Sequence, residues 1–281
     1  MPLRLLSAGI RPLRVRYRSR VRMPRIPVPR GLVYSIYERR LRSSIDRQHL
    51  PGHVAMIIDG NRRWARQWGH PTVSHGHRAG AAKVLEFLGW CDAVGVKVVT
   101  LYLLSADNLV HRDSDELRDL TRIIASLAAA VAARPGWRVQ HVGSTAGLPE
   151  HLTTALTDAE TATAERTGLH VNFAVGYGGR SEIADAMRSI VAQHHLSGGS
   201  LEELATLLTP DLISEHLYTQ GQPDPDLIIR TSGEQRLSDF MLWQSAHSEL
   251  YFVEALGPDI REVDLLRALR DYARRQRRFG A

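Results

Sequence analysis

The sequence predicts an α/β fold, a single domain whose mostly parallel central sheet is flanked by helices. From residue 31 onward, short runs rich in β-branched residues alternate with longer segments whose apolar residues recur every three or four positions. Alternation of this kind is typical of a parallel sheet covered on both faces. A chain of 281 residues can bury a large core without disulfides, and no second domain emerges, so we expect one domain over residues 31–281.

Six segments are expected to form strands because they are apolar, rich in β-branched residues and bounded by turn residues. They are 53–58, 96–103, 137–142, 169–175 and 226–230, with a weaker candidate at 249–253. Amphipathic spacing predicts helices between and after them. These helices are expected at 80–93, 115–133, 149–167, 181–194 and about 262–277.

Capping residues support several of these helix ends. The acidic residues of segment 113–116 suit the start of the second helix, and Ser181 is expected to cap the fourth. Gly95 and Gly168 are expected to end the first and third helices. Glycines and prolines between 197 and 225 predict loops around short helices.

The basic charge of the chain is concentrated at its start. Residues 1–50 hold 13 arginines and no lysine against two acidic residues, so the rest of the chain carries a net charge of −5, although the whole carries +6. Repeated prolines predict a disordered extension over residues 1–30. Such an arm suits a transit peptide, or contact with anionic lipid or nucleic acid. The alternative is that Met23 is the true start.

A single cysteine fits a reducing cytoplasm, and we expect a cytoplasmic protein. No run of 18 apolar residues is present that would span a membrane, and the start lacks the apolar core of a secretory signal. The single cysteine, Cys91, lies in an apolar helical pattern and is expected to be a packed core residue rather than a reactive thiol.

The most informative segment is the strand candidate at 54–58, which runs directly into a polar turn. The turn consists of Asp59, Gly60, Asn61, Arg62 and Arg63. Ligands of open α/β sheets bind where such strands end, and guanidinium groups suit phosphate oxygens. A diphosphate held with Mg²⁺ would use all of these groups. The alternative is a surface turn in which Asp59 caps the next helix.

Three further polar clusters follow other strand candidates. They comprise Ser105, Asp107 and Asn108; Gly176, Gly178, Gly179 and Arg180; and Arg230, Ser232, Arg236 and Ser238. Each cluster has a structural alternative: a capped turn, a tight strand-to-helix turn, or arginines paired with the nearby Asp226 and Glu234. His77 has one too, as an ordinary loop histidine. Four polar strand ends at one sheet edge nevertheless predict a phosphate-binding pocket.

Over about residues 50–280 the sequence resembles the cis-prenyltransferases, the isoprenyl transferase or undecaprenyl diphosphate synthase family. The shared motifs occur in family order. They are the segment from His53 to Ala65, Gly76-His77-Arg78-Ala79-Gly80, Ser105 with Asn108, 172–180, 226–238, Leu242-Trp243-Gln244 and Glu249-Leu250-Tyr251-Phe252. The terminal Arg277-Arg278-Phe279-Gly280 also resembles a family element that reaches the neighbouring subunit.

The resemblance implies condensation of isopentenyl diphosphate with an allylic diphosphate, giving a new cis double bond and free diphosphate. It also implies a hydrophobic tunnel and Mg²⁺. Asp59 and Asn108 match catalytic positions, and Asp59 and Glu249 match metal ligands. The implied substrate-binding residues are Gly60, Asn61, Arg62, Arg63, Trp64, His77, Ser105, Ala106, Asp107, Arg112, Arg230, Arg236, Leu237 and Ser238.

Two details qualify the family pattern. Asn108 with Ser105 matches the position proposed for proton removal from isopentenyl C2, yet a neutral amide is a poor base and the released diphosphate is an alternative acceptor. Leu103 replaces the small residue common in long-chain members, so the sequence resembles short-chain, Z,E-farnesyl-type synthases. A leucine there would close the tunnel floor; the alternative is an ordinary core residue.

Other functions predict different properties. A long-chain synthase for a cell-wall carrier lipid would extend the same reaction, and a silent partner subunit would tend to lose the catalytic residues that this chain keeps. A nucleic-acid-binding protein would need a basic core surface, which the net charge of −5 does not supply. The resemblance further implies a homodimer. The hydrophobic chains of the substrates and products favour peripheral contact with a membrane.

Overall fold

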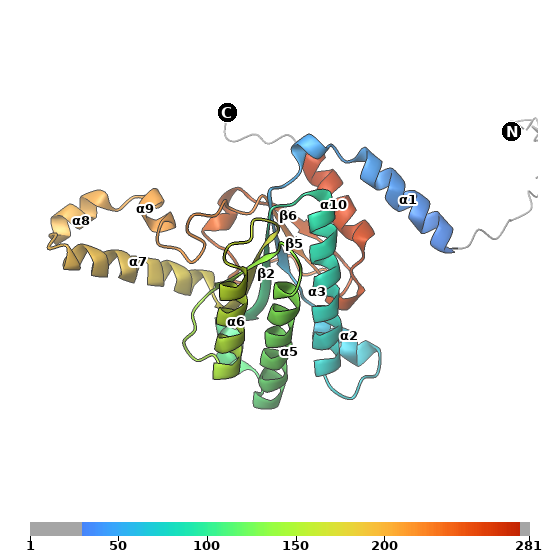
Figure 1. Cartoon of the computed structure of the whole chain (residues 1–281), viewed down its shortest axis with the longest axis horizontal. Helices are drawn as coiled ribbons and strands as arrows, with labels where there is room; N and C mark the ends of the chain where they lie inside the picture. The colour runs from blue at the N-terminus through green and yellow to red at the C-terminus, as the bar shows by residue number, and fades with distance from the viewer. Residues whose placement is uncertain (1–29, 276–281) are drawn as a thin grey trace, which may run out of the picture.

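The computed structural model of the protein describes residues 30–275 (Figure 1). The expectations for residues 1–29, including the start at Met23, and for the C-terminal segment 277–280 lie outside the described residues.

A six-stranded sheet forms the centre of the molecule, in the order β3-β4-β2-β1-β5-β6. Each described strand pairing is parallel, which confirms the predicted sheet. The strands are β1 (His53–Ile57), β2 (Val98–Ser105), β3 (Arg138–Val142), β4 (His170–Tyr177), β5 (Leu227–Arg230) and β6 (Glu249–Phe252). All six strand predictions are confirmed to within two residues at each end, because β-branched runs and their flanking turns mark buried strands clearly.

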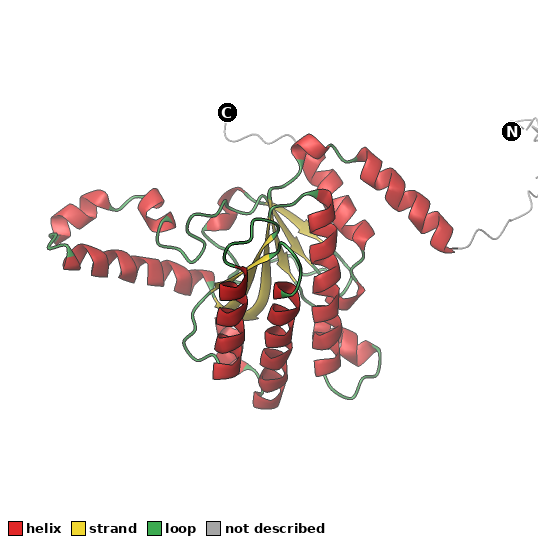
Figure 2. Ribbon diagram, viewed as in Figure 1, coloured by secondary structure: helices red, strands yellow, loops and turns green. Residues whose placement is uncertain are grey.

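Helices account for most of the remaining described chain (Figure 2). The five predicted helices are α3 (Ser74–Val94), α5 (Ser114–Ala132), α6 (Glu150–Thr163), α7 (Gly179–Leu196) and α10 (Glu262–Arg274). Those not predicted individually are α1 (Arg30–Ser44), α2 (Asn61–Gln67), α4 (Ala106–His111), α8 (Leu201–Leu207) and α9 (Pro210–Ser214). Three short 3-10 helices lie at Arg47–His49, Gln244–His247 and Gly257–Asp259.

The predicted helix ends are partly confirmed. Gly95 caps α3 with a left-handed backbone, and Asp113 caps α5 by accepting hydrogen bonds from two backbone N–H groups. Ser181 is not a cap, because α7 already begins at Gly179 with Gly178 at its N-cap. The helix predicted up to Gly168 ends earlier, at Thr163.

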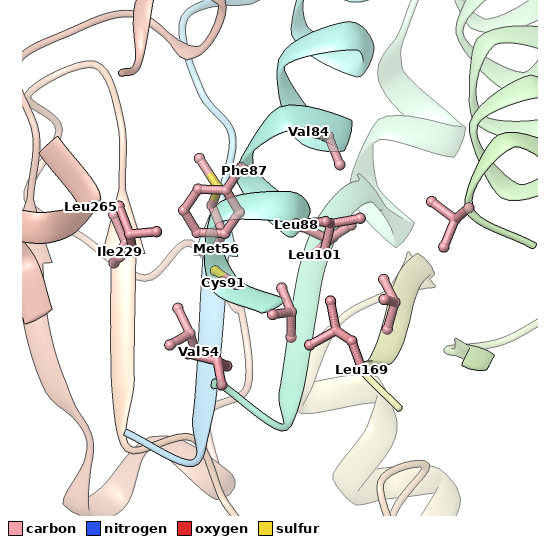
Figure 3. Packing of buried hydrophobic residues seen from close by; sticks show 14 of the residues in the cluster. Val54, Met56, Val84, Phe87, Leu88, Cys91, Leu101, Leu169, Ile229 and Leu265 are labelled. Carbon is pink, nitrogen blue, oxygen red and sulfur yellow. The ribbon is translucent and has the colours of Figure 1, made fainter. Parts of the chain in front are cut away.

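The two faces of the sheet are covered differently. Val54 and Met56 of β1 belong to a large apolar cluster formed with α3, α5 and α10, and Figure 3 shows Met56, Phe87, Leu88 and Leu101 packed within it. Ala55 and Ile57 face a smaller cluster on the other side, which includes Phe240 and Met241 from the segment after β5. Apolar side chains of the irregular segment after β5 thus pack on this second face.

Cys91 lies inside the larger cluster, as predicted for a core residue (Figure 3). Its side chain is fully buried, and burial raises the pKa of the thiol. A thiol held neutral in an apolar core is unreactive.

The helices α7, α8 and α9 form an arm that extends away from the sheet (Figure 1). Leu196 and Leu201 at its far end are 85% and 80% exposed. None of the described helices is apolar over a length that would cross a bilayer.

Close contact between α2 and α3 fixes the first polar turn. A Cβ placed on Gly76 would lie 2.0 Å from the backbone oxygen of Asn61, and one on Gly80 would lie 2.4 Å from the Asn61 side-chain oxygen. These two glycines therefore allow α3, which begins at Ser74 and not at the predicted residue 80, to pack directly on the start of α2.

We expect Gly76→Ala to lower the free energy of unfolding by about 1–3 kcal/mol, because the added methyl group collides with backbone that cannot rotate away. Gly89→Ala is the matched control: it lies in the same helix with open space around its Cβ, and should raise stability by about 0.5–1 kcal/mol. Chemical denaturation of both variants measures the difference. Equal effects at the two positions would contradict this account.

Candidate active site

The four polar clusters predicted at strand ends come together at one edge of the sheet. Their strands are neighbours in the order β4-β2-β1-β5 and all run in the same direction. A cavity of about 1030 Å³ opens at this edge, lined by residues from each cluster. The structure thus forms the predicted pocket at the carboxyl ends of the strands.

Asp59 is one of the residues that line the polar part of this cavity. Its Oδ2 accepts a hydrogen bond of 2.7 Å from Nη2 of Arg230, and its Oδ1 accepts one of 2.6 Å from the backbone N–H of Gly60. Burial alone would raise the pKa of Asp59, but the hydrogen bond and charge of Arg230 outweigh it and hold the pKa below its usual value. The carboxylate is therefore ionised at neutral pH. The alternative of a helix cap is not observed, since Gly60 is the N-cap of α2.

Arg230 is itself held rigidly. Its side chain is only 4% exposed, and Nη1 donates to the Ser238 hydroxyl at 2.8 Å and to the backbone oxygen of Arg236. Its Nε is buried without a partner. Ser238 and Asp239 have left-handed backbone angles, with φ of 52° and 64°; such strain is typical of functional sites. The Nε–H group of Arg230 is thus available to donate a hydrogen bond to a ligand.

A second group of basic side chains lines the cavity on the side of α3 and α5. It consists of Arg62, His77 and Arg112. Nη2 of Arg63 donates to the Ser232 hydroxyl at 2.7 Å and lies 3.8 Å from Oδ1 of Asp59. The cavity is therefore lined by two sets of basic side chains, Arg230 and Arg63 beside Asp59, and Arg62, His77 and Arg112 near α3 and α5, which suits two anions bound in one cavity.

The inner part of the cavity is apolar. Its lining side chains come from α3, β2 and α5: Ala81, Val84, Leu103, Leu104, Leu120, Ile123, Ile124 and Leu127. Leu103 is partly buried and lines the cavity, while also packing against the larger apolar cluster. A polar mouth joined to an apolar interior matches the hydrophobic tunnel expected from the sequence.

Ser105, Asp107 and Asn108 also line the cavity. The Ser105 hydroxyl caps α4 by accepting the Asn108 N–H at 3.1 Å. The capping alternative for Ser105 is therefore correct, and it coexists with a position at the cavity wall.

Five predicted site residues do not line the cavity. Trp64 donates from Nε1 to Asp259, and its ring stacks on His70. The Arg236 guanidinium pairs with Glu234, and only its backbone oxygen contacts Arg230. Ala106 and Leu237 are likewise absent from the lining, and Leu237 packs in the smaller apolar cluster. Glu249 is the fifth.

The structure separates Glu249 from Asp59. In the sheet register Glu249 lies beside Leu227 at the beginning of β5, whereas Asp59 follows Ile57, which lies beside Arg230 at the end of β5. The two carboxylates are thus at opposite ends of the sheet, and Glu249 pairs with Arg275. A single chain therefore does not bring Glu249 to the cavity beside Asp59, and its role as a metal ligand stays a prediction.

Six residues with polar side chains line the cavity but were not among the predicted site residues: Arg66, Tyr102, Tyr177, Arg180, Ser181 and Asp239. Arg180 belongs to the polar cluster with Gly176, Gly178 and Gly179 that the sequence analysis identified. Its position after a strand end could therefore have marked it as a site residue. Tyr102 lies in the middle of an apolar strand, where nothing in the sequence distinguishes it from a core residue.

A parallel sheet with basic groups around one carboxylate, next to an apolar cavity, defines an enzyme for substrates that combine an anionic head with an apolar chain. The model of a family described as "Putative undecaprenyl diphosphate synthase" matches residues 57–280. The chain belongs to this family, the cis-prenyltransferases, and is a prenyltransferase.

Individual relatives agree with this assignment. The chain is 54% identical to isoprenyl transferase 1 of Streptomyces avermitilis, over 89% of this chain and 97% of that protein. It is 51% identical to (2Z,6E)-farnesyl diphosphate synthase of Mycolicibacterium smegmatis, over 92% of this chain and 98% of that protein. Lavandulyl diphosphate synthase from Lavandula x intermedia, solved with dimethylallyl diphosphate, is 36% identical with a TM-score of 0.77, over 83% of this chain and all of that chain.

Replacing Arg230 by Gln should lower the free energy of unfolding at pH 7 by about 1–3 kcal/mol, because the partly buried Asp59 carboxylate loses its cation. The native pKa of Asp59 is lowered, so the pair stabilises the fold above the ordinary carboxyl pKa and this contribution is lost as pH falls through the native pKa. The stability difference should therefore shrink below about pH 4.

Denaturant titrations from pH 7 downward measure this difference. Arg236→Gln serves as the control, since its guanidinium is 61% exposed and pairs only at the surface. A stability difference for Arg230→Gln that does not change with pH would show that Asp59 is not the group responsible.

Proposed function

We propose that this protein condenses isopentenyl diphosphate with a short allylic diphosphate to give a short-chain, Z,E-farnesyl-type product. The observation that carries the proposal is the cavity itself, which is lined by Asp59, by two sets of basic side chains and by apolar side chains that include Leu103. Relatives about 50% identical named (2Z,6E)-farnesyl and short-chain Z-isoprenyl diphosphate synthases support the product length.

In this proposal the two diphosphates occupy the two basic groups. Arg62, His77 and Arg112, with the backbone of the turn after β1, bind the allylic diphosphate, whose chain extends into the apolar part of the cavity. Arg230 and Ser238 bind the isopentenyl diphosphate. Positive groups fixed around the departing diphosphate stabilise the negative charge that develops as its bond to carbon breaks.

The residues present fit Mg²⁺ as a partner of the diphosphates. Asp59 supplies one ionised carboxylate in the cavity, and the described residues contain no group of three or more His, Cys, Asp or Glu side chains that would hold a metal alone. Mg²⁺ is usually bound in this way, by one or two carboxylates together with substrate phosphates and water. When bound, the ion supplies positive charge to the departing diphosphate.

The remaining step removes a proton from C2 of the isopentenyl unit as the new carbon–carbon bond forms. Asn108 and Ser105 line the cavity, and neither is a base at neutral pH. We assign them to orienting the isopentenyl unit, and the released diphosphate to accepting the proton.

Two further parts of the proposal concern assembly. A homodimer is supported by the exposed apolar side chains on the arm of α7 to α9, where Leu196 and Leu201 have little cover in a single chain. Contact with a membrane surface is supported by the apolar products and by the arginine-rich start of the sequence.

The proposed function is tested by incubating the protein with labelled isopentenyl diphosphate, Mg²⁺ and allylic primers of different lengths, and sizing the products by chromatography. We expect a fifteen-carbon product from geranyl diphosphate. Asp59→Ala should lower kcat/KM by more than about 100-fold. Asp115→Asn, at an exposed surface position, is the control. Long polyprenyl products would contradict the proposed chain length, and no transfer with any primer would contradict the function.

Leu103→Ala should lengthen the products, because the smaller side chain extends the apolar part of the cavity. Leu103→Met keeps the side-chain volume and should leave the product length unchanged. The same chromatography reads out both variants. If Leu103→Ala gives products no longer than those of the parent protein, Leu103 does not close the cavity.

A further inference from the structure

We propose that Glu116 is a positioning residue that holds Arg62, His77 and Arg112 in the arrangement that receives the allylic diphosphate. The inference rests on the proposed function and adds a residue to it. Nothing in the sequence marked Glu116 as more than one of several acids at the start of a helix.

The contacts of Glu116 carry this proposal. Its Oε1 lies 3.0 Å from Nε2 of His77 and 3.0 Å from Nη1 of Arg112, and its Oε2 lies 3.4 Å from Nη2 of Arg62. The Glu116 side chain is only 7% exposed. One buried carboxylate thus contacts all three basic side chains on this side of the cavity.

These contacts join four separate segments of the chain. Arg62 lies in α2, His77 in α3, Arg112 directly after α4, and Glu116 in the first turn of α5. The position of Glu116 is itself fixed, because its N–H donates to the Asp113 side chain and the start of a helix favours an acidic group. Glu116 therefore offers a rigid point to which three other segments are tied.

The two arginines would repel each other if they were gathered here without an anion, and their side chains would adopt many rotamers. Ordering such a side chain when a ligand binds costs about 0.5–1.5 kcal/mol. Glu116 offsets the repulsion and fixes the geometry before substrate arrives. It engages one terminal nitrogen of each guanidinium, and Arg112 keeps a buried Nε with no partner. The basic groups thus retain donors for an anion.

Glu116 also acts on His77. Burial lowers the pKa of His77, while the hydrogen bond that the His77 ring donates to Glu116 raises it. A hydrogen bond between Nε2 and a carboxylate requires the proton to be on Nε2, so Glu116 also selects the tautomer of the neutral ring. Arg112 and Arg62 are the other charged groups acting on this histidine.

Glu116→Gln tests the proposal because it keeps the side-chain size and removes the charge. We expect KM for geranyl diphosphate to rise by about ten-fold, equivalent to about 1.4 kcal/mol, with less than about a two-fold change in KM for isopentenyl diphosphate. Glu116→Asp restores the charge and should recover part of the loss. Asp115→Asn removes an exposed carboxylate from the same helical turn, where it pairs with Arg118, and should change neither KM.

The measured KM values distinguish a Glu116 that holds the basic side chains in place from a Glu116 whose negative charge only repels the substrate. If Glu116 only opposed the substrate's charge, Glu116→Gln would tighten geranyl diphosphate binding, and this result would overturn the proposal. An equal rise in both KM values, or a loss that follows the fraction of unfolded protein in thermal melts, would also overturn it.

A binding experiment separates failure of this inference from failure of the proposed function. Calorimetric titration of geranyl diphosphate into the wild type and into Glu116→Gln needs no turnover, and should show the same ten-fold weakening. The tautomer of His77, read from its ring ¹⁵N shifts, should change in Glu116→Gln and not in Asp115→Asn. Wild type that binds geranyl diphosphate without prenyl transfer would refute the proposed function alone.

Discussion

Asp59 and Arg230 end two neighbouring parallel strands, and the structure of the site depends on their ion pair. β1 and β5 are neighbours in the sheet, so the Asp59 carboxylate and the Arg230 guanidinium meet at the carboxyl ends of these two strands. Each charge would be costly in this partly buried position without the other. Arg230 in turn orders the loop after β5 through Ser238 and the Arg236 carbonyl. The geometry of the sheet thus sets the geometry of the polar mouth.

The apolar interior follows from the same sheet. β2 lies beside β1, and its side chains face α3 and α5 across the space that forms the inner cavity. The close approach of α3 to Asn61, allowed by Gly76 and Gly80, keeps that interior next to the basic groups. A polar head and an apolar chain of one molecule therefore find their matching environments side by side.

Strand positions and the four polar strand ends could be predicted from the sequence, because periodicity and turn residues are local signals. Glu116 could not, since an acid in the first turn of a helix is commonplace and only the tertiary contacts with three other segments distinguish it. The distance between Glu249 and Asp59 could not be predicted for a related reason: the motif of Glu249 is local, but its place in the sheet depends on the register between β5 and β6. The orientation of Trp64 toward Asp259 also depends on contacts distant in sequence.

Because of its position, Cys91 can report on local opening of the apolar core. This sole thiol of the chain is sealed between α3 and the sheet, in contact with the cluster that forms the inner wall. A maleimide or similar alkylating reagent can reach it only after α3 separates from the strands, so the rate of labelling measures how often the wall beside the tunnel opens.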